Sequence, residues 1–486
     1  MNKPLRRISI FCGLLVLALL LRTNWLQYVK AEDLSTRKEN RRVQIAQYAS
    51  ERGNIIVGGQ PITGSVVTNG SDYKFKRTYL DGPMWAPVTG YASQAFGSTQ
   101  LESLEDGILT GNDDRLFFDR TIGMFTGEKK QGGNVVTTLN AAAQKAAFTS
   151  LGNKKGAVAA IDPRTGAILA LASTPSYDPS TFAGNSKADE KAWVALKDSE
   201  DKNLVNRALR ETYPPGSTFK VVTAAAALEH GVVSNIDAPT DTPEPYILPG
   251  TKTQLPNHAS GCEKATLKFA LEVSCNSVFA NVGDKVGRDK MLETAQKFGF
   301  NNDKIDVPVR AFASVYDKNM GRDGNAQSAI GQFNTAATPL QMTMVAAAVA
   351  NDGKLMKPYM VDKVTAPNLD VLEKHEPEEM SRPLSPANAQ KVQQMMVDVV
   401  ENGTGTGAKI NGVTVGGKTG TAQHGEKNAK RPYAWFISYA KTDKGSPVAV
   451  AVVIEDSQAD REDITGGGLA APVALAVMNA VIKSQG

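Results

Sequence analysis

The chain has 486 residues, a length that predicts two or three domains. Hydrophobic residues make up 41% and charged residues 21%, a balance typical of folded globular proteins that excludes a disordered or fibrous chain. The net charge of +4 is small and no tract is dense in Lys or Arg, which excludes a nucleic-acid-binding protein. No metal or other cofactor is expected, because His230, His258, His375 and His424 form no paired-ligand spacing.

The first 30 residues predict a membrane anchor. Three basic residues precede an apolar run from Ile8 to Leu21, which predicts a cytoplasmic N-terminus and an exported remainder. The run reaches the ~20 residues that a bilayer needs if it continues past Arg22, whose side chain would extend to the interface beside Trp25. The competing interpretation is a cleaved signal peptide. The bulky stretch at 24–28 offers no small-residue cleavage site, so the sequence favours a single-pass anchor in the cell membrane with an extracytoplasmic body.

Residues 31–133 are polar and rich in glycine, with short alternating runs at 54–57 and 64–67 that predict strands separated by turns. From residue 134 onward the pattern changes. An alanine-rich stretch at 140–151 predicts a helix. Two apolar runs then flank a Pro/Gly turn at 162–166, which indicates an antiparallel hairpin.

Three more strand-like runs and a closing helix are predicted near the C-terminus, at 413–423, 433–439, 447–454 and 470–482. Strands at both ends of a region whose middle is helical favour one α+β domain, with a sheet assembled from distant segments of the chain.

Cysteine is scarce. Cys262 and Cys275 are close in sequence, and in an oxidising compartment we expect a disulfide between them; the alternative is two buried free thiols. Cys12 lies in the apolar N-terminal segment and is expected to be inert.

A serine and a lysine three residues apart are the first candidates for catalysis. Two prolines bar a helix before Gly216, whereas 219–228 has a helical pattern, so Ser217 is expected at a helix N-terminus. Lys220 lies on the same face, within reach of the Ser217 hydroxyl. A serine hydroxyl needs an adjacent base, and lysine can be one only if its pKa is lowered by burial or a nearby cation. Alone, the pair is a weak signal, and a serine cap beside an exposed lysine is the safer interpretation.

Two further polar motifs follow. Ser-Cys-Asn at 274–276 lies within 269–279, which has a helical pattern, and Gly-Gly-Lys-Thr-Gly-Thr-Ala at 416–422 lies in a strand-like run. Each motif also has a purely structural interpretation: the second as a polar pair inside a helix, and the third as a glycine-tolerant edge strand. Their order and separation favour a functional interpretation, since the second motif begins 57 residues after Ser217 and Lys418 follows a further 144 residues on. This series is the signature of penicillin-recognising acyl-enzymes.

Beyond these motifs, the sequence resembles class B penicillin-binding proteins over nearly all of the chain after the anchor. Arg-Gly-Asn-Ile at 52–55 is similar to the R-G-x-I motif that opens their N-terminal domain, and 156–179 is similar to their first strand pair. The stretch 329–341 is similar to the family's segment between the second and third motifs. The short N-terminal domain and the overall length look most like the actinobacterial subfamily, penicillin-binding protein A.

The resemblance implies an α+β fold of the penicillin-binding transpeptidase, or serine β-lactamase-like, type. In this fold an antiparallel sheet is flanked by helices, and we expect a smaller, mostly-β N-terminal domain and one transmembrane helix besides. The expected division is a cytoplasmic tip and signal-anchor at 1–30, a non-catalytic dimerisation or pedestal-like domain at 31–133, and a transpeptidase domain at 134–486.

The function implied is that of a peptidoglycan D,D-transpeptidase acting on stem peptides that end in D-Ala-D-Ala. Ser217 would attack the carbonyl of the penultimate D-Ala with Lys220 as base, and an amine of a neighbouring stem peptide would take the acyl group. Ser274 would relay the proton to the leaving amine, and Asn276 would hydrogen-bond the substrate amide. β-Lactam antibiotics would acylate the same serine.

The third motif would supply Lys418, Thr419 and Gly420 to the catalytic site. Lys418 would lower the pKa of Lys220 and attract the substrate carboxylate, which Thr419 and Thr421 would bind. Backbone N–H groups of Ser217 and Thr421 would form the oxyanion hole. The implied partners are the cytoplasmic membrane, a glycan polymerase and proteins of cell division or elongation.

Several alternatives remain open on the sequence alone. A D,D-carboxypeptidase would use the same motifs, with water in place of the amine, and a β-lactam sensor or a non-catalytic division scaffold represents a different class. A second, glycosyltransferase domain has no room between anchor and catalytic domain. A class A β-lactamase would carry an E-x-x-L-N element after the second motif, and the stretch around Glu293 lacks it.

Overall fold

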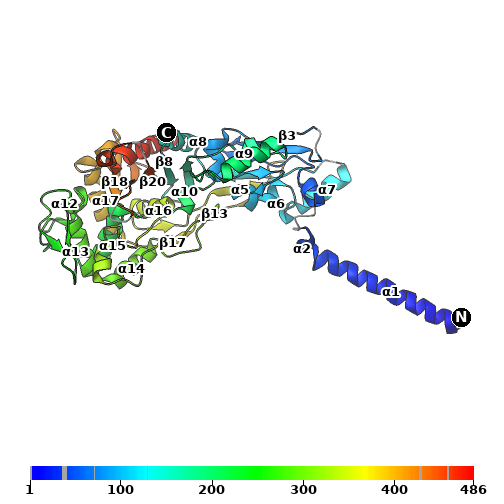
Figure 1. Ribbon diagram of the computed structural model, residues 1–486, viewed down its shortest axis with the longest axis horizontal. Coiled ribbons are helices and arrows are strands. Elements are labelled where there is room, and N and C mark those ends of the chain that lie inside the picture. The colour runs from blue at the N-terminus through cyan, green and yellow to red at the C-terminus, as the bar shows by residue number, and fades with distance from the viewer. Residues whose placement is uncertain are drawn as a thin grey trace.

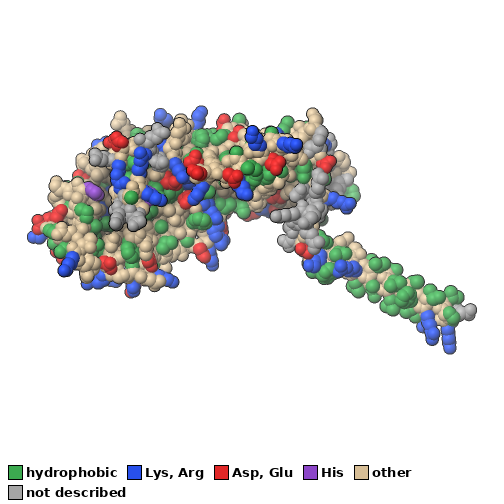
Figure 2. Space-filling view, in the orientation of Figure 1, with side chains coloured by type: hydrophobic (Ala, Val, Ile, Leu, Met, Phe, Trp, Pro, Cys, Tyr) green, Lys and Arg blue, Asp and Glu red, His purple; other side chains and the backbone are tan. Residues whose placement is uncertain are grey.

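The computed structural model describes residues 3–35, 41–69, 72–127, 130–425, 429–456 and 459–485. Figure 1 shows an elongated body with helix α1 (Lys3–Tyr28) projecting from one end. No α1 side chain is buried and its mean hydropathy reaches 2.0, so α1 is a candidate membrane span. Hydrophobic side chains run along α1, and basic ones gather near its N-terminal end (Figure 2). A second apolar stretch, Gly466–Gln485, is 44% buried and belongs to the core of the body.

The region after the anchor is mixed α/β rather than mostly β. Its sheet has the order β16-β15-β7-β1-β2 and includes two strands from far downstream, so residues 361–374 complete a sheet that begins at residue 55. The five strands of the sheet are β1 (Ile55–Val57), β2 (Gln60–Pro61), β7 (Asn134–Thr137), β15 (Val361–Thr365) and β16 (Val371–Lys374). Two hairpins lie beside it, formed by β3 (Thr63–Val67) with β4 (Phe75–Tyr79) and β5 (Ala92–Ser93) with β6 (Gly97–Ser98).

The helices of this region are short, which is why the expectation of a mostly-β domain missed them. They are α2 (Ala31–Ser35), α3 (Arg41–Gln47), α4 (Gly82–Thr89), α5 (Gln100–Leu104), α6 (Asp106–Leu109), the 3₁₀ turn η1 (Asp114–Leu116) and α7 (Phe117–Thr126). Apart from α7, these runs of three to eight residues make at most about two turns, too few for a clear apolar period, and α4 contains an internal proline at Pro87.

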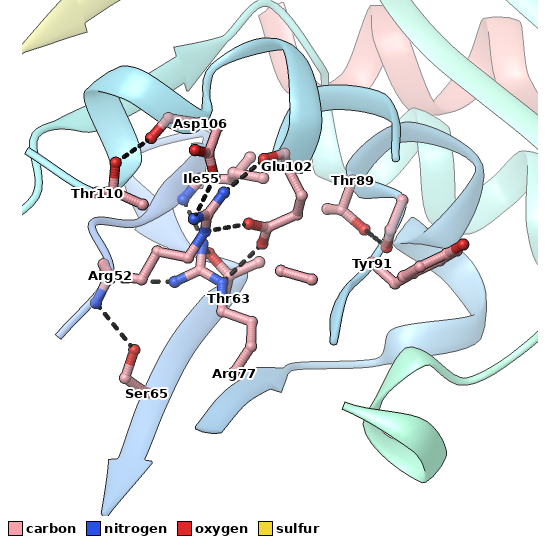
Figure 3. A network of polar contacts seen from close by, with 12 residues as sticks. Arg52, Ile55, Thr63, Ser65, Arg77, Thr89, Tyr91, Glu102, Asp106 and Thr110 are labelled. Atoms are coloured by element: carbon pink, nitrogen blue, oxygen red, sulfur yellow. Dashed lines mark hydrogen bonds and ion pairs between the residues drawn. The ribbon is translucent and has the colours of Figure 1, made fainter. Parts of the chain in front are cut away.

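A buried ion network explains the Arg-Gly-Asn-Ile motif at 52–55 (Figure 3). The fully buried Glu102 accepts hydrogen bonds from Arg52 Nε and Arg77 Nε, both at 2.6 Å. Arg52 also pairs with Asp106 at 2.7 Å. Burial alone would raise the pKa of Glu102, but the two guanidinium groups together hold it below its ordinary value. Gly53 allows close backbone contact, because an added Cβ would lie 1.8 Å from the Gly133 carbonyl oxygen.

The second sheet is antiparallel throughout, has the order β18-β19-β20-β8-β9, and confirms the hairpin and the three C-terminal strands predicted from the sequence. Its strands are β8 (Lys155–Ile161), β9 (Ile168–Thr174), β18 (Thr414–Ala422), β19 (Tyr433–Thr442) and β20 (Gly445–Asp456). Along β20, Ala449, Ala451 and Val453 pack into one core and Val448 and Val450 into another. Both faces are therefore buried, which accounts for the unbroken apolar runs.

Helices cover the two faces of this sheet. The predicted helices α8 (Ala141–Leu151) and α18 (Ala471–Gln485) pack on one face, and α11 (Lys220–Glu229), α16 (Pro339–Ala350) and α17 (Pro386–Glu401) pack on the other. The remaining α-helices are α9 (Lys187–Lys197), α10 (Arg207–Arg210), α12 (Leu267–Glu272), α13 (Asn276–Val286), α14 (Arg288–Lys297) and α15 (Arg322–Ser328). The short strands are β10 (Tyr246–Ile247), β11 (Gln254–Leu255), β12 (Asp306–Val307), β13 (Val309–Arg310), β14 (Leu355–Met356) and β17 (Glu379–Ser381).

Candidate active site

Ser217 lies in the 3₁₀ turn η3 (Gly216–Phe219), which leads directly into α11. Gly216 has a φ of +54°, a conformation that favours glycine, and an added Cβ would meet the Ala422 Cβ of β18 at 3.1 Å. The Gly216 N–H donates to the Gly331 carbonyl at 2.9 Å. These contacts hold the turn between the end of β18 and the loop at Gly331, with Ser217 half-buried.

Lys220, in the first turn of α11, is fully buried. Its Nζ donates to the Ser274 carbonyl oxygen at 2.8 Å, to Ser274 Oγ at 3.1 Å and to Asn276 Oδ1 at 2.8 Å. The Ser217 hydroxyl is not one of these three acceptors. The second motif therefore orients the ammonium group of Lys220.

Ser274 Oγ lies between two buried lysines. Lys418 Nζ donates to it at 3.0 Å and to the Thr419 carbonyl oxygen, also at 3.0 Å. Burial lowers the pKa of Lys418 to about 7. The pKa of Lys220 is held well below its ordinary value, first by burial and then by the charge of Lys418. At neutral pH the site can thus hold a neutral amine beside the Ser217 turn.

The second motif interrupts a helix instead of lying inside one, which corrects the expectation of a continuous helix over 269–279. Helix α12 ends at Glu272 and α13 begins at Asn276. Between them Ser274 adopts a φ of +68°, which is uncommon for a residue with a side chain and is found mainly at functional sites. The break turns both the carbonyl and the hydroxyl of Ser274 towards Lys220.

The glycines of the third motif serve close packing. An added Cβ at Gly420 would lie 3.0 Å from the Pro215 carbonyl oxygen and 3.1 Å from Trp435 Cβ, so a larger residue here would push β18 and the Ser217 turn apart by a few tenths of an ångström. At Gly416 and Gly417 an added Cβ would lie 2.3 and 2.6 Å from aromatic rings of β19.

The two threonines of β18 differ in their surroundings. The Thr419 hydroxyl is hydrogen-bonded to the hydroxyl of Thr404 at 2.6 Å, and Thr419 is only 8% exposed. The Thr421 side chain is exposed. The backbone of Thr421 lies next to Gly216, where an added Cβ would be 3.3 Å from the Thr421 carbonyl oxygen. Thr421 is therefore the threonine that is open to an incoming ligand.

Comparison with known proteins agrees with this geometry. The sequence-family model of the penicillin-binding protein transpeptidase domain matches residues 156–479. The family model of the penicillin-binding protein A dimerisation domain matches residues 52–135. The chain belongs to the penicillin-binding protein transpeptidase family.

Relatives in this family are similar over the whole chain. Peptidoglycan D,D-transpeptidase PbpA of Mycobacterium tuberculosis is 39% identical over 100% of both chains, and its namesake from Mycolicibacterium smegmatis is 37% identical over 99% of both. The structure of penicillin-binding protein A from M. tuberculosis as a ceftriaxone acyl-enzyme superposes with a TM-score of 0.85 at 38% identity, covering 90% of this chain and 100% of that chain. Its penicillin G acyl-enzyme gives a TM-score of 0.83 at 39% identity, covering 89% and 100%.

Asn257 is a site residue of this penicillin-binding protein that sequence reasoning missed. Its Oδ1 accepts hydrogen bonds from the N–H groups of Asn276 at 2.7 Å and Ser277 at 3.0 Å. Its Nδ2 donates to Ser277 Oγ at 2.8 Å and to Glu244 Oε1 at 3.0 Å. The N-cap residue Cys275 makes no side-chain cap bond, so Asn257 caps α13 from a distant loop.

The same loop is tied to the second motif twice more. Asn276 Nδ2 donates to the Pro256 carbonyl oxygen at 2.9 Å. A disulfide joins Cys262 to Cys275, with a Cα–Cα distance of 5.7 Å. The cysteine spacing was the one sequence signal that could have placed this loop beside the motif, but no local pattern distinguishes Asn257 within it.

The structure thus brings the predicted side chains of all three motifs into one region, from the Ser217 turn, the α12–α13 break and β18. In the described part of the chain, no group of three or more His, Cys, Asp or Glu side chains is placed to hold a metal ion. Glu293, on an exposed face of α14, is paired with Lys297 at 2.8 Å.

Proposed function

We propose that this protein is a peptidoglycan D,D-transpeptidase that works through an acyl-enzyme on Ser217. The observation that carries the proposal is the pair of buried lysines that share Ser274 Oγ, at 3.1 Å from Lys220 and 3.0 Å from Lys418. A lysine whose pKa is lowered can accept a proton at neutral pH, and only a neutral amine can activate a serine hydroxyl.

The Ser217 oxygen forms a bond to the carbonyl carbon of the penultimate D-Ala, and its proton passes to the neutral Lys220. The proton then passes through the Ser274 hydroxyl to the nitrogen of the terminal D-Ala as the peptide bond breaks. In the second half, an amine of a neighbouring stem peptide attacks the ester carbonyl and loses a proton to Lys220. Lys220 returns that proton to the Ser217 oxygen as the ester bond breaks, so the free serine and the neutral lysine are regenerated. Protons and bonds balance without a cofactor.

The other site residues bind the substrate and the transition state. Lys418 supplies positive charge for the terminal carboxylate, and the Thr419 and Thr421 hydroxyls bind it, Thr421 being the exposed one. Asn276 binds the substrate amide through the second N–H of Nδ2, since the first is bonded to Pro256. The backbone N–H groups of Ser217 and Thr421 hold the developing oxyanion.

β-Lactams are proposed to acylate Ser217 and to remain bound. A deacylating water needs a carboxylate base near the ester, and the one candidate that the sequence offered, Glu293, is turned to solvent and paired with Lys297. The similar penicillin-binding protein A of M. tuberculosis was itself captured as an acyl-enzyme with ceftriaxone and with penicillin G.

The body of the protein is proposed to lie outside the cytoplasm on a single span, α1, with its basic N-terminal end inside. The proposed division is the anchor at 1–30, a non-catalytic domain at 31–133 completed by β15 and β16, and the transpeptidase domain at 134–486. A glycan polymerase and division or elongation proteins are the proposed partners.

Incubation of the full chain with benzylpenicillin, followed by intact mass over hours, tests the acyl-enzyme. We expect one persistent adduct on wild type and none on Ser217→Ala; no adduct on wild type would refute the mechanism and favour a scaffold. A second incubation, with a stem peptide ending in D-Ala-D-Ala and an amine acceptor, separates the enzymes. Cross-linked product supports transpeptidation, whereas release of D-Ala with hydrolysed donor alone would favour the D,D-carboxypeptidase.

A further inference from the structure

Helix α7 carries an aromatic face that is uncovered in the described part of the chain. Phe117, Phe118 and Phe125, here called the α7 face, are 56%, 77% and 89% exposed. At 3.6 residues per turn they lie within about 100° of the helix circumference. Three large exposed rings on one side of a ten-residue helix are unusual for a protein surface in water and mark an interaction site.

The base of α7 is fixed to the body. Leu116, which immediately precedes the helix, is 1% exposed and belongs to the core. Arg115 is ion-paired with Asp113 at 2.8 Å and also with Glu373 of β16. The helix therefore cannot simply rotate to bury its rings, because the residues before it are held by both the core and the sheet.

The α7 face lies at the end of the body where the chain enters from the anchor. Gln47, the last residue of α3, donates to Asp106 of α6 at 3.0 Å, and the turn after α6 leads straight into η1 and α7. Figure 1 shows α7 at the same end of the body as α1, opposite to α12, α13 and α14.

The chain between anchor and body is short. Trp25, with the Arg22 guanidinium 4.5 Å from its ring centre, and Tyr28 stand at the end of α1, where such side chains mark a membrane interface. Only 12 residues lie between Tyr28 and Arg41, which makes 13 steps from one Cα atom to the next. Fully extended, they span at most about 45 Å, so the entry end of the body stays near the membrane surface.

We infer that α7 lies in the outer interface of the membrane that α1 spans, with the α7 face inserted among headgroups and upper acyl chains. The inference rests on the anchorage proposed above. A lipid surface suits this helix because the anchor keeps it at high effective concentration near the bilayer, where even weak interfacial binding by three Phe side chains persists. The body then has two attachments, which fix its tilt and the height of the Ser217 turn above the membrane.

Depth-dependent fluorescence quenching on the full chain tests this. Cys262 and Cys275 are joined and Cys12 is the free cysteine of the described residues, so Cys12→Ser with Phe118→Cys gives a single label on α7. The protein is reconstituted at a high lipid ratio into vesicles of phosphatidylcholine and phosphatidylglycerol that contain no other protein. Cys12→Ser with Asp289→Cys, on exposed α14 at the far end, is the matched control.

We expect the label at 118 to be quenched several-fold more than that at 289 by a nitroxide placed just below the lipid headgroups, and less by aqueous iodide. Equal quenching at 118 and 289 would overturn the inference. Protection from iodide without quenching by the lipid nitroxide would also overturn it, in favour of a protein occupant such as a second copy of the chain.

The native Cys12, labelled in the wild-type protein, separates this inference from the anchorage on which it rests. A Cys12 label quenched from within the bilayer, together with a water-exposed label at 118, refutes the α7 contact alone. A Cys12 label that remains in water refutes the anchorage and the α7 contact with it. Benzylpenicillin acylation at the wild-type rate shows that each labelled variant is folded, because α7 and α14 carry no residue of the active site.

Discussion

Replacing Asn257 by alanine should slow acylation through the position of the second motif. Asn257 Oδ1 accepts both free N–H groups at the start of α13, from Asn276 at 2.7 Å and Ser277 at 3.0 Å. Alanine leaves the two donors without this partner. The same turn of helix carries Asn276 Oδ1, which holds Lys220 Nζ at 2.8 Å, so a displaced α13 start misplaces the proposed base.

The magnitude follows from the energy of a helix cap. Loss of an Asn cap costs about 0.5–2 kcal/mol, typically ~1 kcal/mol. If that energy is what keeps the second motif in place, up to the same amount is added to the acylation barrier. Since 1.36 kcal/mol corresponds to a factor of ten in rate, a loss of 1–2 kcal/mol slows acylation roughly 5- to 30-fold.

The assay is the second-order rate constant for acylation by benzylpenicillin, with thermal unfolding measured in parallel. Asn140→Ala is the matched control, because Asn140 caps α8 on the other face of the sheet by accepting from the Ala143 N–H at 2.9 Å. It should lower the melting temperature without changing acylation.

A rescue variant separates positioning from general destabilisation. Asn257→Asp keeps an acceptor at the helix N-terminus, where negative charge is favourable, and Glu244→Gln removes the carboxylate that would face it. The double variant should recover most of the lost rate. Wild-type acylation by Asn257→Ala, or an equal slowing by Asn140→Ala, would refute the reasoning.

Lys418→Met should move the acid limb of the acylation pH profile to higher pH, because the pKa of Lys220 rises when its positive neighbour is removed; a limb that does not move would assign the base elsewhere. Gly420→Ala should cut acylation at least tenfold, estimated from a barrier increase of about 1.4 kcal/mol, since its Cβ would press on the Pro215 carbonyl at 3.0 Å; wild-type rates would mean that β18 can shift freely. Glu102→Gln should destabilise the N-terminal region by about 3–5 kcal/mol in thermal unfolding. The pKa of Glu102 is lower in the folded protein than in the unfolded chain, so its ionised side chain stabilises the fold fully at pH values above the unfolded pKa of about 4.3. That stabilisation is lost as the pH falls through the folded-state pKa, so the melting temperatures of variant and wild type should converge in acid.

The three motifs could be located from sequence because each is contiguous and lies on an element with a strong local pattern. The prolines before Gly216 and the apolar run after it predict the turn that carries Ser217, and the run at 413–423 predicts the strand that carries Lys418. The sheet could be anticipated in outline for the same reason, since strands buried on both faces are continuously apolar.

Long-range contacts could not be predicted in this way. Asn257 acts through two backbone N–H groups that lie 19 and 20 residues away, and its own surroundings carry no catalytic pattern. The break at Ser274 was hidden because helical patterns lie on both sides of it, while the φ of +68° depends on contacts with Lys220 from another helix. The pairing of β15 with β7 is likewise set by tertiary packing, so no local sequence signal reports it.

The two buried lysines also explain why the free site is poised for an anionic substrate. Within the residues that the structure describes, neither Lys220 nor Lys418 has a carboxylate partner, and both donate to the one hydroxyl of Ser274. Two cations so close in a buried site are unfavourable together, so one proton is readily lost. Burial lowers the pKa of both lysines, and the charge of Lys418 lowers that of Lys220, the residue beside Ser217, in addition. In the proposed mechanism, a substrate carboxylate that binds at Lys418 stabilises the ammonium form there and raises its pKa. Binding then leaves the positive charge on Lys418 and the neutral amine on Lys220, the distribution that serine activation requires.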